Sequence, residues 1–173
     1  MKKKNDLKQH TIADSFSFSG KGLHTGLSIN LKFLPALENH GIRIKRVDLP
    51  GQPEMEAVAD YVGQTVRGTV LVKDEMQVST IEHAMAALYA MGIDNCLLEV
   101  DAPEFPILDG SARYFVDKII ETGIKEQNAE RNFYKVTEEI SYTNPETGSK
   151  ISIAPDDDFK VDVKIGFRSK MLK

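Results

Sequence analysis

The sequence predicts an α/β fold of the α+β type: a two-layer sandwich in which a sheet packs against two helices, followed by the opening strands of a second, similar domain. Three observations support this. Apolar residues recur at every second position in several segments between residues 16 and 72, at helical spacing between residues 80 and 123, and again at every second position after residue 133. Strands and helices mixed in this way bury their apolar faces against one another in layers.

The first part of the chain is rich in predicted strands. FSFSG at 16–20 precedes LSINLKFL at 27–34, whose alternate residues predict one buried face: Leu27, Ile29, Leu31 and Phe33. GIRIKRV at 41–47 repeats the alternation, and TVRGTVLV at 65–72 is a further β-branched run. NCLLEV at 95–100 predicts one more short strand between the two helical segments.

Two helices follow from the change of period. From Thr80 the apolar residues take helical spacing, and Gly92 is a typical C-terminal stop. The second helix is predicted at 111–123, with a buried face made by Ala112, Phe115, Val116, Ile119 and Ile120. DAPEFPILDG at 101–110 is the proline-rich connection that leads into it.

The end of the chain opens what we expect to be a second domain. KEQNAERN at 125–132 is polar and is predicted to be a linker. Strands are predicted again at 134–142, 150–154 and 159–167, with a hairpin turn at NPETGS. We therefore predict two domains, residues 1–126 and residues 127–173, the second incomplete because a small sheet without a covering layer rarely stands alone.

Composition narrows the class of protein. The chain has 173 residues, 41% of them hydrophobic, which predicts a globular fold with a buried core. A net charge of -4 and the absence of a long basic run argue against nucleic acid as a partner. A single cysteine, Cys96, fits a reducing compartment, and no apolar run approaches the roughly 20 residues of a membrane span, so a cytoplasmic location is expected.

STIEH at 79–83 allows two interpretations. Ser79 and Glu82 have the spacing of a capping box, in which the serine hydroxyl and the glutamate each satisfy a free backbone N–H at a helix start. Alternatively, Glu82 and His83 project beyond the helix end, His83 binding a metal and Glu82 handling protons. Residue spacing alone favours the cap for Glu82 and leaves His83 unexplained.

Two other segments also allow a structural and a functional interpretation. GKGLHTG at 20–26 is either a glycine-rich turn or a loop that cradles phosphate, although its spacing matches neither common phosphate-binding motif. In DAPEFPILDGSA, the carboxylates of Asp101, Glu104 and Asp109 could be ligands, but Asp109 and Ser111 also fit a turn that begins a helix. The local pattern favours the structural interpretation of both.

GKGLHTG, RGTVLV, VSTIEHAMAAL and GIDNCLLEVDAPEFPILDGSA, in this order, resemble the N-terminal domain of the UDP-3-O-acyl-N-acetylglucosamine deacetylases. The resemblance runs from about Gln9 to Gly123 and continues more loosely to Phe167. It implies a zinc-dependent hydrolase that removes an acetyl group from a UDP-linked acylated amino sugar in the committed step of lipid A synthesis. It also implies two similar domains that face each other across the active site.

The resemblance assigns roles residue by residue. It makes Glu82 the general base and His83 a zinc ligand. Other residues match positions that line the substrate site: Leu23, His24, Val66, Arg67 and Gly68. Some family members have a cysteine where this chain has Gly68. The family's other two zinc ligands and its general-acid histidine would lie beyond Lys173, so these residues alone are expected to be inactive and to bind zinc weakly.

The sequence also indicates further partners and leaves an alternative function open. The lipid substrate implies transient contact with the inner membrane, and unfinished sheet edges would allow association with another chain. Some family members are fused to a hydroxyacyl carrier-protein dehydratase. The sequence of these residues does not indicate whether such a fusion exists here. The alternative function is a noncatalytic α/β module that binds a nucleotide sugar or a protein partner through the GKGLHTG and DAPEFP loops.

Overall fold

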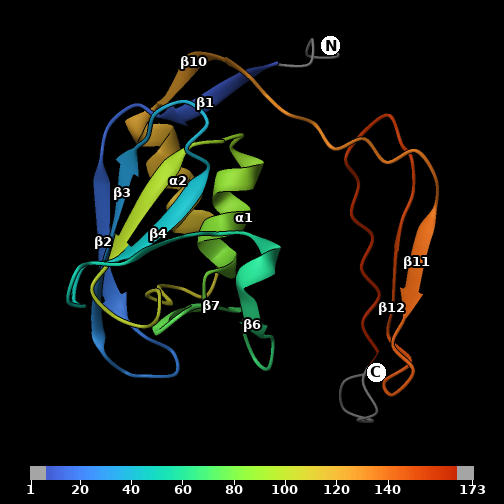
Figure 1. Cartoon of the computed structure of the whole chain (residues 1–173), viewed down its shortest axis with the longest axis horizontal. Coiled ribbons are helices and arrows are strands. Elements are labelled where there is room, and N and C mark those ends of the chain that lie inside the picture. Colours follow the sequence, from blue (N-terminus) through green and yellow to red (C-terminus); the bar gives the residue numbers. More distant parts are fainter. Residues whose placement is uncertain (1–6, 167–173) are drawn as a thin grey trace. The chain divides into compact units, whose positions relative to one another are not determined.

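The computed structural model describes residues 7–166, and the chain divides into two compact units, Met1–Arg131 and Asn132–Lys173 (Figure 1). Unit 1 is built on a five-stranded mixed sheet in the order β2-β3-β9-β4-β5. Its neighbours pair antiparallel except β4 and β9, which are parallel. The strands are β2 (Phe16–Lys21), β3 (Ser28–Pro35), β4 (Ile42–Arg46), β5 (Glu54–Glu56) and β9 (Cys96–Val100).

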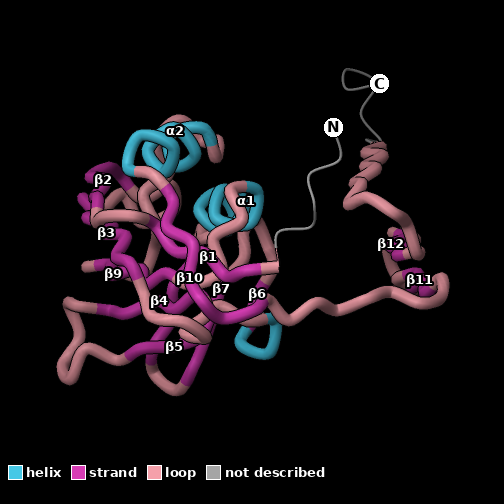
Figure 2. Tube along the Cα trace, turned by 90° about the horizontal axis from the view of Figure 1, so that it is seen from above, coloured by secondary structure: helices cyan, strands magenta, loops and turns pink. Residues whose placement is uncertain are grey.

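Two helices lie together on one side of this sheet, α1 (Glu82–Ala90) and α2 (Arg113–Thr122) (Figure 2). Ile29, Leu31 and Phe33 of β3 are buried, as the period-two pattern predicted, but Leu27 precedes the strand and is 48% exposed. Phe33 stacks on Phe16 with ring centroids 4.7 Å apart, and Phe115 of α2 packs edge-on against Phe18 at 5.0 Å. The predicted α/β two-layer arrangement is confirmed, but Ile120 is 62% exposed and does not belong to the buried face of α2.

A ribbon of two antiparallel strands, β1 (Lys8–Ile12) and β10 (Ile124–Glu130), closes unit 1. The linker predicted at 125–132 is therefore wrong for most of its length. Its residues are polar because β10 is held by hydrogen bonds rather than by an apolar face. Gln127 Oε1 accepts from the Asn95 amide at 2.8 Å, and the same Asn95 nitrogen also donates to Gln9 at 2.8 Å.

A three-stranded antiparallel sheet, β6-β7-β8, leads into helix α1. Its strands are β6 (Val62–Gln64), β7 (Val70–Lys73) and β8 (Met76–Ser79), preceded by a short 3₁₀ helix at Ala59–Tyr61. The strand predicted at 65–72 is right only from Val70, because residues 65–69 form the connection between β6 and β7. The predicted strand therefore contains a loop that brings a backbone N–H to the start of α1.

Unit 2 contains a hairpin of β11 (Ile140–Thr143) and β12 (Lys150–Ile153), paired antiparallel. The turn predicted at NPETGS is confirmed, with Asn144 N–H donating to the Ser149 carbonyl at 2.8 Å. The strand predicted at 134–142 is shorter than expected, and residues 159–166 form none; the last residue of that prediction, Phe167, lies outside the described residues. Within residues 7–166, neither helix is long and apolar enough to cross a membrane.

Candidate active site

Glu82 and His83 are the first two residues of α1 and are both half-buried. Strand β8 ends at Ser79, and Thr80 then turns the chain with a φ of 60°. Positive φ is costly for a β-branched residue, by roughly 1–3 kcal/mol, and such residues concentrate at functional sites. The sharp turn allows the chain to pass directly from a strand into the helix that carries the carboxylate and the imidazole.

The predicted capping box is not formed. The helix N-cap is Ile81, and no side chain caps it. Ser79 still belongs to β8, and its hydroxyl donates to the Pro103 carbonyl at 3.3 Å. The Glu82 carboxylate instead accepts a hydrogen bond from the backbone N–H of Thr69. Glu82 is therefore directed toward the β6–β7 connection and away from its own helix end.

Gly68 marks the place where two of the predicted site residues converge. A Cβ added at Gly68 would lie 3.6 Å from Glu82 Oε1 and 3.9 Å from His24 Nε2. Both functional groups therefore lie within 4 Å of one point beside the β6–β7 connection. The fold brings together the STIEH, GLHTG and RGT segments, which are far apart in the sequence.

The other predicted substrate-lining residues are on the surface around this point. Leu23 is 59% exposed and Val66 is 81% exposed, and Arg67 is exposed with a φ of 60°. The structure thus places Leu23 and His24 on one loop and Val66, Arg67 and Gly68 on another, and the Glu82 carboxylate and the His24 ring both lie beside Gly68.

The GKGLHTG segment is a turn between β2 and β3, as its local pattern predicted. It is held by Glu104, whose carboxylate accepts from His24 N–H at 2.9 Å, from Thr25 N–H at 2.9 Å and from the Thr25 hydroxyl at 2.8 Å. The Thr80 hydroxyl also donates to Glu104, at 3.1 Å. Burial alone would raise the pKa of the Glu104 carboxyl, but these hydrogen bonds outweigh it and lower the pKa.

Glu104 is the residue whose importance the sequence did not reveal. Its side chain is fully buried, and the structural interpretation given to its loop is correct in that it binds protein groups. Asp101 likewise binds Asn30 through the backbone N–H and the side-chain amide, both at 2.7 Å. Asp109 accepts from Ser111 N–H at 3.0 Å in the turn that begins α2. The sequence signal that could have identified Glu104 was a carboxylate among apolar residues in DAPEFP.

The described residues do not by themselves form a complete metal site. Within residues 7–166, no three His, Cys, Asp or Glu side chains lie together as a group that could hold a metal ion. A catalytic zinc normally has three protein ligands. An imidazole at His83 next to the carboxylate of Glu82 is a suitable pair of side-chain types, but a zinc ion would need further ligands from outside these residues.

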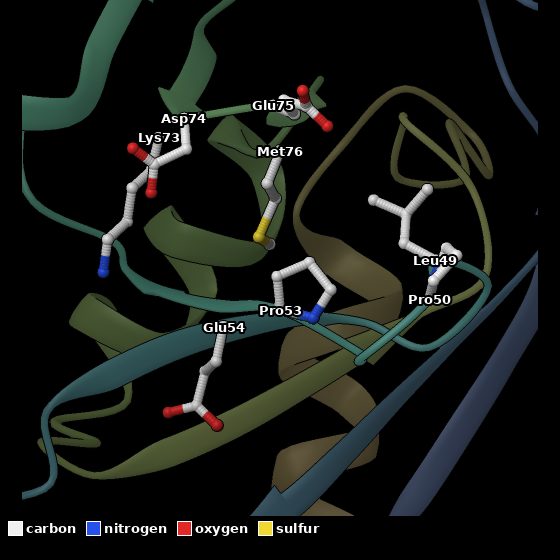
Figure 3. Close-up of a pocket in the computed structure, with 8 residues that line it drawn as sticks. All are labelled: Leu49, Pro50, Pro53, Glu54, Lys73, Asp74, Glu75 and Met76. Atoms are coloured by element: carbon white, nitrogen blue, oxygen red, sulfur yellow. The ribbon is translucent and has the colours of Figure 1, made fainter.

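A separate hollow lies beside the start of β5 and the β7–β8 turn (Figure 3). Its volume is about 670 Å³, and none of the predicted site residues lines it. Its surface mixes apolar and charged side chains, those of Leu49, Pro50, Pro53, Glu54, Lys73, Asp74, Glu75 and Met76. The convergence at Gly68, and not this hollow, is therefore the candidate active site.

Unit 1 has a carboxylate and an imidazole at the start of a helix, beside two loops that meet near Gly68. The fold defines the class of the protein as an α/β domain of the two-layer type. Comparison with known families makes the assignment specific. The sequence model of the family LpxC, UDP-3-O-acyl N-acetylglycosamine deacetylase, matches residues 9–173. The chain belongs to this family.

Curated relatives agree with the family assignment. The chain is 58% identical to the "Bifunctional enzyme LpxC/FabZ" of Porphyromonas gingivalis over 165 aligned residues. The aligned residues cover 95% of this chain and 36% of the relative. It is 54% identical to the protein of the same name from Bacteroides thetaiotaomicron, over 96% of this chain and 36% of the relative. The "UDP-3-O-acyl-N-acetylglucosamine deacetylase" of Shewanella pealeana is 44% identical, over 92% and 52% respectively. The chain therefore spans about a third to a half of the length of these relatives.

Proposed function

We propose that this chain contributes the Glu82 side of the active site of a deacetylase that hydrolyses the N-acetyl group of UDP-3-O-(3-hydroxyacyl)-N-acetylglucosamine, the committed step of lipid A biosynthesis. Membership of the LpxC family supports the reaction class. The observation that carries the assignment of residues is the convergence of Glu82 Oε1 and His24 Nε2 beside Gly68. The proposed location is cytoplasmic, which a free, buried Cys96 fits.

The proposed chemistry for this chain centres on Glu82. Its carboxylate accepts a proton from the attacking water as the new C–O bond forms at the acetamide carbonyl. As the tetrahedral intermediate collapses, the leaving nitrogen takes up a proton from the general acid, which the family resemblance places outside residues 1–173, and the C–N bond breaks to give acetate and the free amine. The Thr69 N–H, which already binds Glu82 Oε1, orients this carboxylate. Zinc bound with His83 as one ligand would supply Lewis acidity at the carbonyl.

The surrounding residues are proposed to bind the substrate. Leu23 and Val66 are exposed apolar side chains on the two loops that meet near Gly68, so they are suited to contact the acyl part. Arg67 supplies a cation suited to the diphosphate. His24 faces the same point as Glu82 and is suited to hydrogen-bond the sugar or the carbonyl region.

Glu82→Gln in the full-length protein tests this proposal against the noncatalytic module. The amide keeps the shape of the side chain but cannot take a proton, so turnover should fall by a factor of roughly 10²–10⁴. Substrate binding, measured by calorimetry, should persist, and product formation is followed by mass spectrometry. Glu99→Gln is the matched control, because Glu99 pairs with Lys45 on the sheet, at 3.8 Å, and lies outside the site. Undiminished turnover in Glu82→Gln would rule out the role proposed for Glu82.

The residues 1–173 alone should bind zinc weakly and show no deacetylation, because His83 is one ligand and a catalytic zinc site normally has three. Isothermal titration of the purified chain with zinc measures this directly. His83→Ala should remove what binding there is, while His40→Ala, at a histidine away from the site, should not. Tight one-to-one binding that depends on His83, or chelator-sensitive turnover by this chain, would contradict the prediction.

A further inference from the structure

Glu104 is a buried carboxylate that the proposed chemistry does not use. Its side chain is fully buried, yet the hydrogen bonds it accepts keep its pKa below the ordinary value. A buried carboxylate without adequate partners would be strongly destabilising. The bonds come from two backbone N–H groups, of His24 and Thr25, and from two hydroxyls, of Thr25 and Thr80.

These bonds join three segments at the site. Glu104 lies on the connection after β9, its backbone bridged in parallel to Ser79 at the end of β8. Phe105 N–H donates to the Ser79 carbonyl at 3.0 Å, and Ile107 N–H donates to the Lys21 carbonyl at 2.9 Å. The Glu104 segment therefore runs between the end of β8 and the end of β2. Its carboxylate connects the loop that carries His24 to Thr80, which lies two residues before the start of α1.

The Glu104 carboxylate is hydrogen-bonded to the segment that carries His24 and to the segment that leads to Glu82. His24 lies on the loop whose backbone N–H groups donate hydrogen bonds to Glu104. Glu82 lies two residues after Thr80, whose hydroxyl also donates to Glu104. The two functional groups then converge on the same point beside Gly68. A carboxylate with one oxygen toward His24 N–H and Thr80 and the other toward Thr25 acts as a rigid two-sided acceptor.

Gly22 shows that the loop is built around this carboxylate. Gly22 is buried, and a methyl group added there would collide with the Glu104 carboxylate and the Thr25 hydroxyl, and would lie 3.0 Å from Glu104 Cδ. The absence of a side chain therefore lets the loop approach Glu104 closely enough for its amides to bond. Gly22→Ala provides a second way to displace the loop without removing a charge.

We propose that Glu104 is a positioning residue, which acts through His24 by fixing the GLHTG loop against the start of α1. The inference rests on the proposed function for its catalytic consequence, while the clamp itself concerns the described residues alone. Glu104 touches neither reacting atoms nor substrate in this scheme. Its loss should shift His24 relative to Glu82, and a displacement of about 1 Å at such a site costs roughly a hundredfold in rate.

The clamp is tested first by amide hydrogen exchange in the ¹⁵N-labelled chain of residues 1–173. Glu104→Gln should accelerate exchange at His24 and Thr25 by tenfold or more, because hydrogen bonds to a charged acceptor are lost, while the amides of β3 and β9 stay protected. Asp48→Asn is the matched control: Asp48 is a carboxylate bound by buried Arg46 at 2.6 Å, away from the GLHTG loop. Unchanged exchange at His24 and Thr25 in Glu104→Gln would overturn the proposal.

The catalytic consequence is tested by a double-mutant cycle in the full-length protein. Glu104→Gln should lower kcat/KM by about a hundredfold, and adding it to His24→Ala should cause little further loss, because one residue acts through the other. Additive losses would overturn the proposal, since a purely structural role predicts them. If Glu104→Gln does not fold, Thr80→Val and Gly22→Ala take its place in the hydrogen-exchange and kinetic assays. If the unmodified protein shows no deacetylation, the proposed function fails, and the exchange result still decides the clamp.

Discussion

Unit 1 and unit 2 have similar alternating sequences, but alternate side chains of these segments are buried in unit 1 and exposed in unit 2. In β3 of unit 1, alternate side chains are buried beneath two helices. In β11 and β12 of unit 2, every residue is exposed, including Tyr142 at 60% and Ile151 at 70%. The comparison shows that period-two alternation specifies a strand and its two faces, whereas burial of either face needs a second layer.

The two units also differ in how their polar groups are used. Unit 1 buries charged groups with partners: Arg46, with its side chain 6% exposed, binds both oxygens of Asp48 and donates to the Gln77 carbonyl at 2.8 Å. The Asp156–Lys160 pair of unit 2 joins two side chains that are 42% and 67% exposed. Removing one partner of a buried pair leaves an uncompensated charge and is strongly destabilising, whereas exposed pairs contribute little to stability.

Removing a core aromatic should show the largest difference between the units. Phe33→Ala leaves a cavity among Phe16, Phe18 and Phe115, and the free energy of unfolding should fall by about 3–5 kcal/mol. The matched variant in unit 2, Tyr142→Ala, should change it by no more than about 0.5 kcal/mol. Urea denaturation measures both. A comparable loss in Tyr142→Ala would mean that the unit 2 hairpin is covered in solution.

Truncation should locate the boundary between the units. The predicted boundary after residue 126 stays a prediction, and the contacts favour Arg131/Asn132. A chain ending at Arg131 should keep the thermal midpoint of unit 1. A chain ending at Glu126 loses the bonds of Gln127 to Asn95 and of Arg131 to Asp94, so its midpoint should fall by about 4 °C for each kcal/mol lost. Equal midpoints for the two chains would contradict this boundary.

Acidification should weaken unit 1 through its held carboxylates. The pKa of Asp48 is lowered mainly by the hydrogen bond from Arg46, and that of Glu104 by bonds that outweigh its burial. A carboxyl whose pKa is lower in the folded state stabilises the fold at pH values above its unfolded pKa, about 3.9 for Asp and about 4.3 for Glu. That stability is lost as the pH falls through the folded values.

Thermal unfolding between pH 3 and pH 7 measures the effect. Glu104→Gln should flatten the acid limb of stability against pH. Asp156→Asn should not, although the pKa of Asp156 is also lowered by its bond to Lys160, because that pair is exposed. An acid limb identical in Glu104→Gln and the unmodified chain would show that the Glu104 hydrogen bonds do not stabilise the fold.

Local pattern was sufficient for most of the elements of unit 1. Alternation at 27–34, the short apolar run at 95–100 and helical spacing from residue 80 all correspond to observed structure, and in unit 2 the turn at NPETGS does so too. The failures share one cause, which is that the deciding contacts come from distant residues. Polar β10 is a strand because β1 supplies its hydrogen bonds, and residues 65–69 are a loop although their composition is β-branched.

The sequence by itself determined the family, through motifs whose order is specific, and it determined which residue types are available for catalysis. Only the tertiary structure decided what those residues do locally. Ser79 stays in strand β8, so Glu82 does not take part in a capping box, and the Glu82 carboxylate and the His24 ring both lie beside Gly68. The tertiary structure also buried Glu104 between two segments that lie 24 and 80 residues away in the chain. Spacing in a sequence specifies neighbours along one element, whereas a carboxylate that joins three segments depends on how the elements pack.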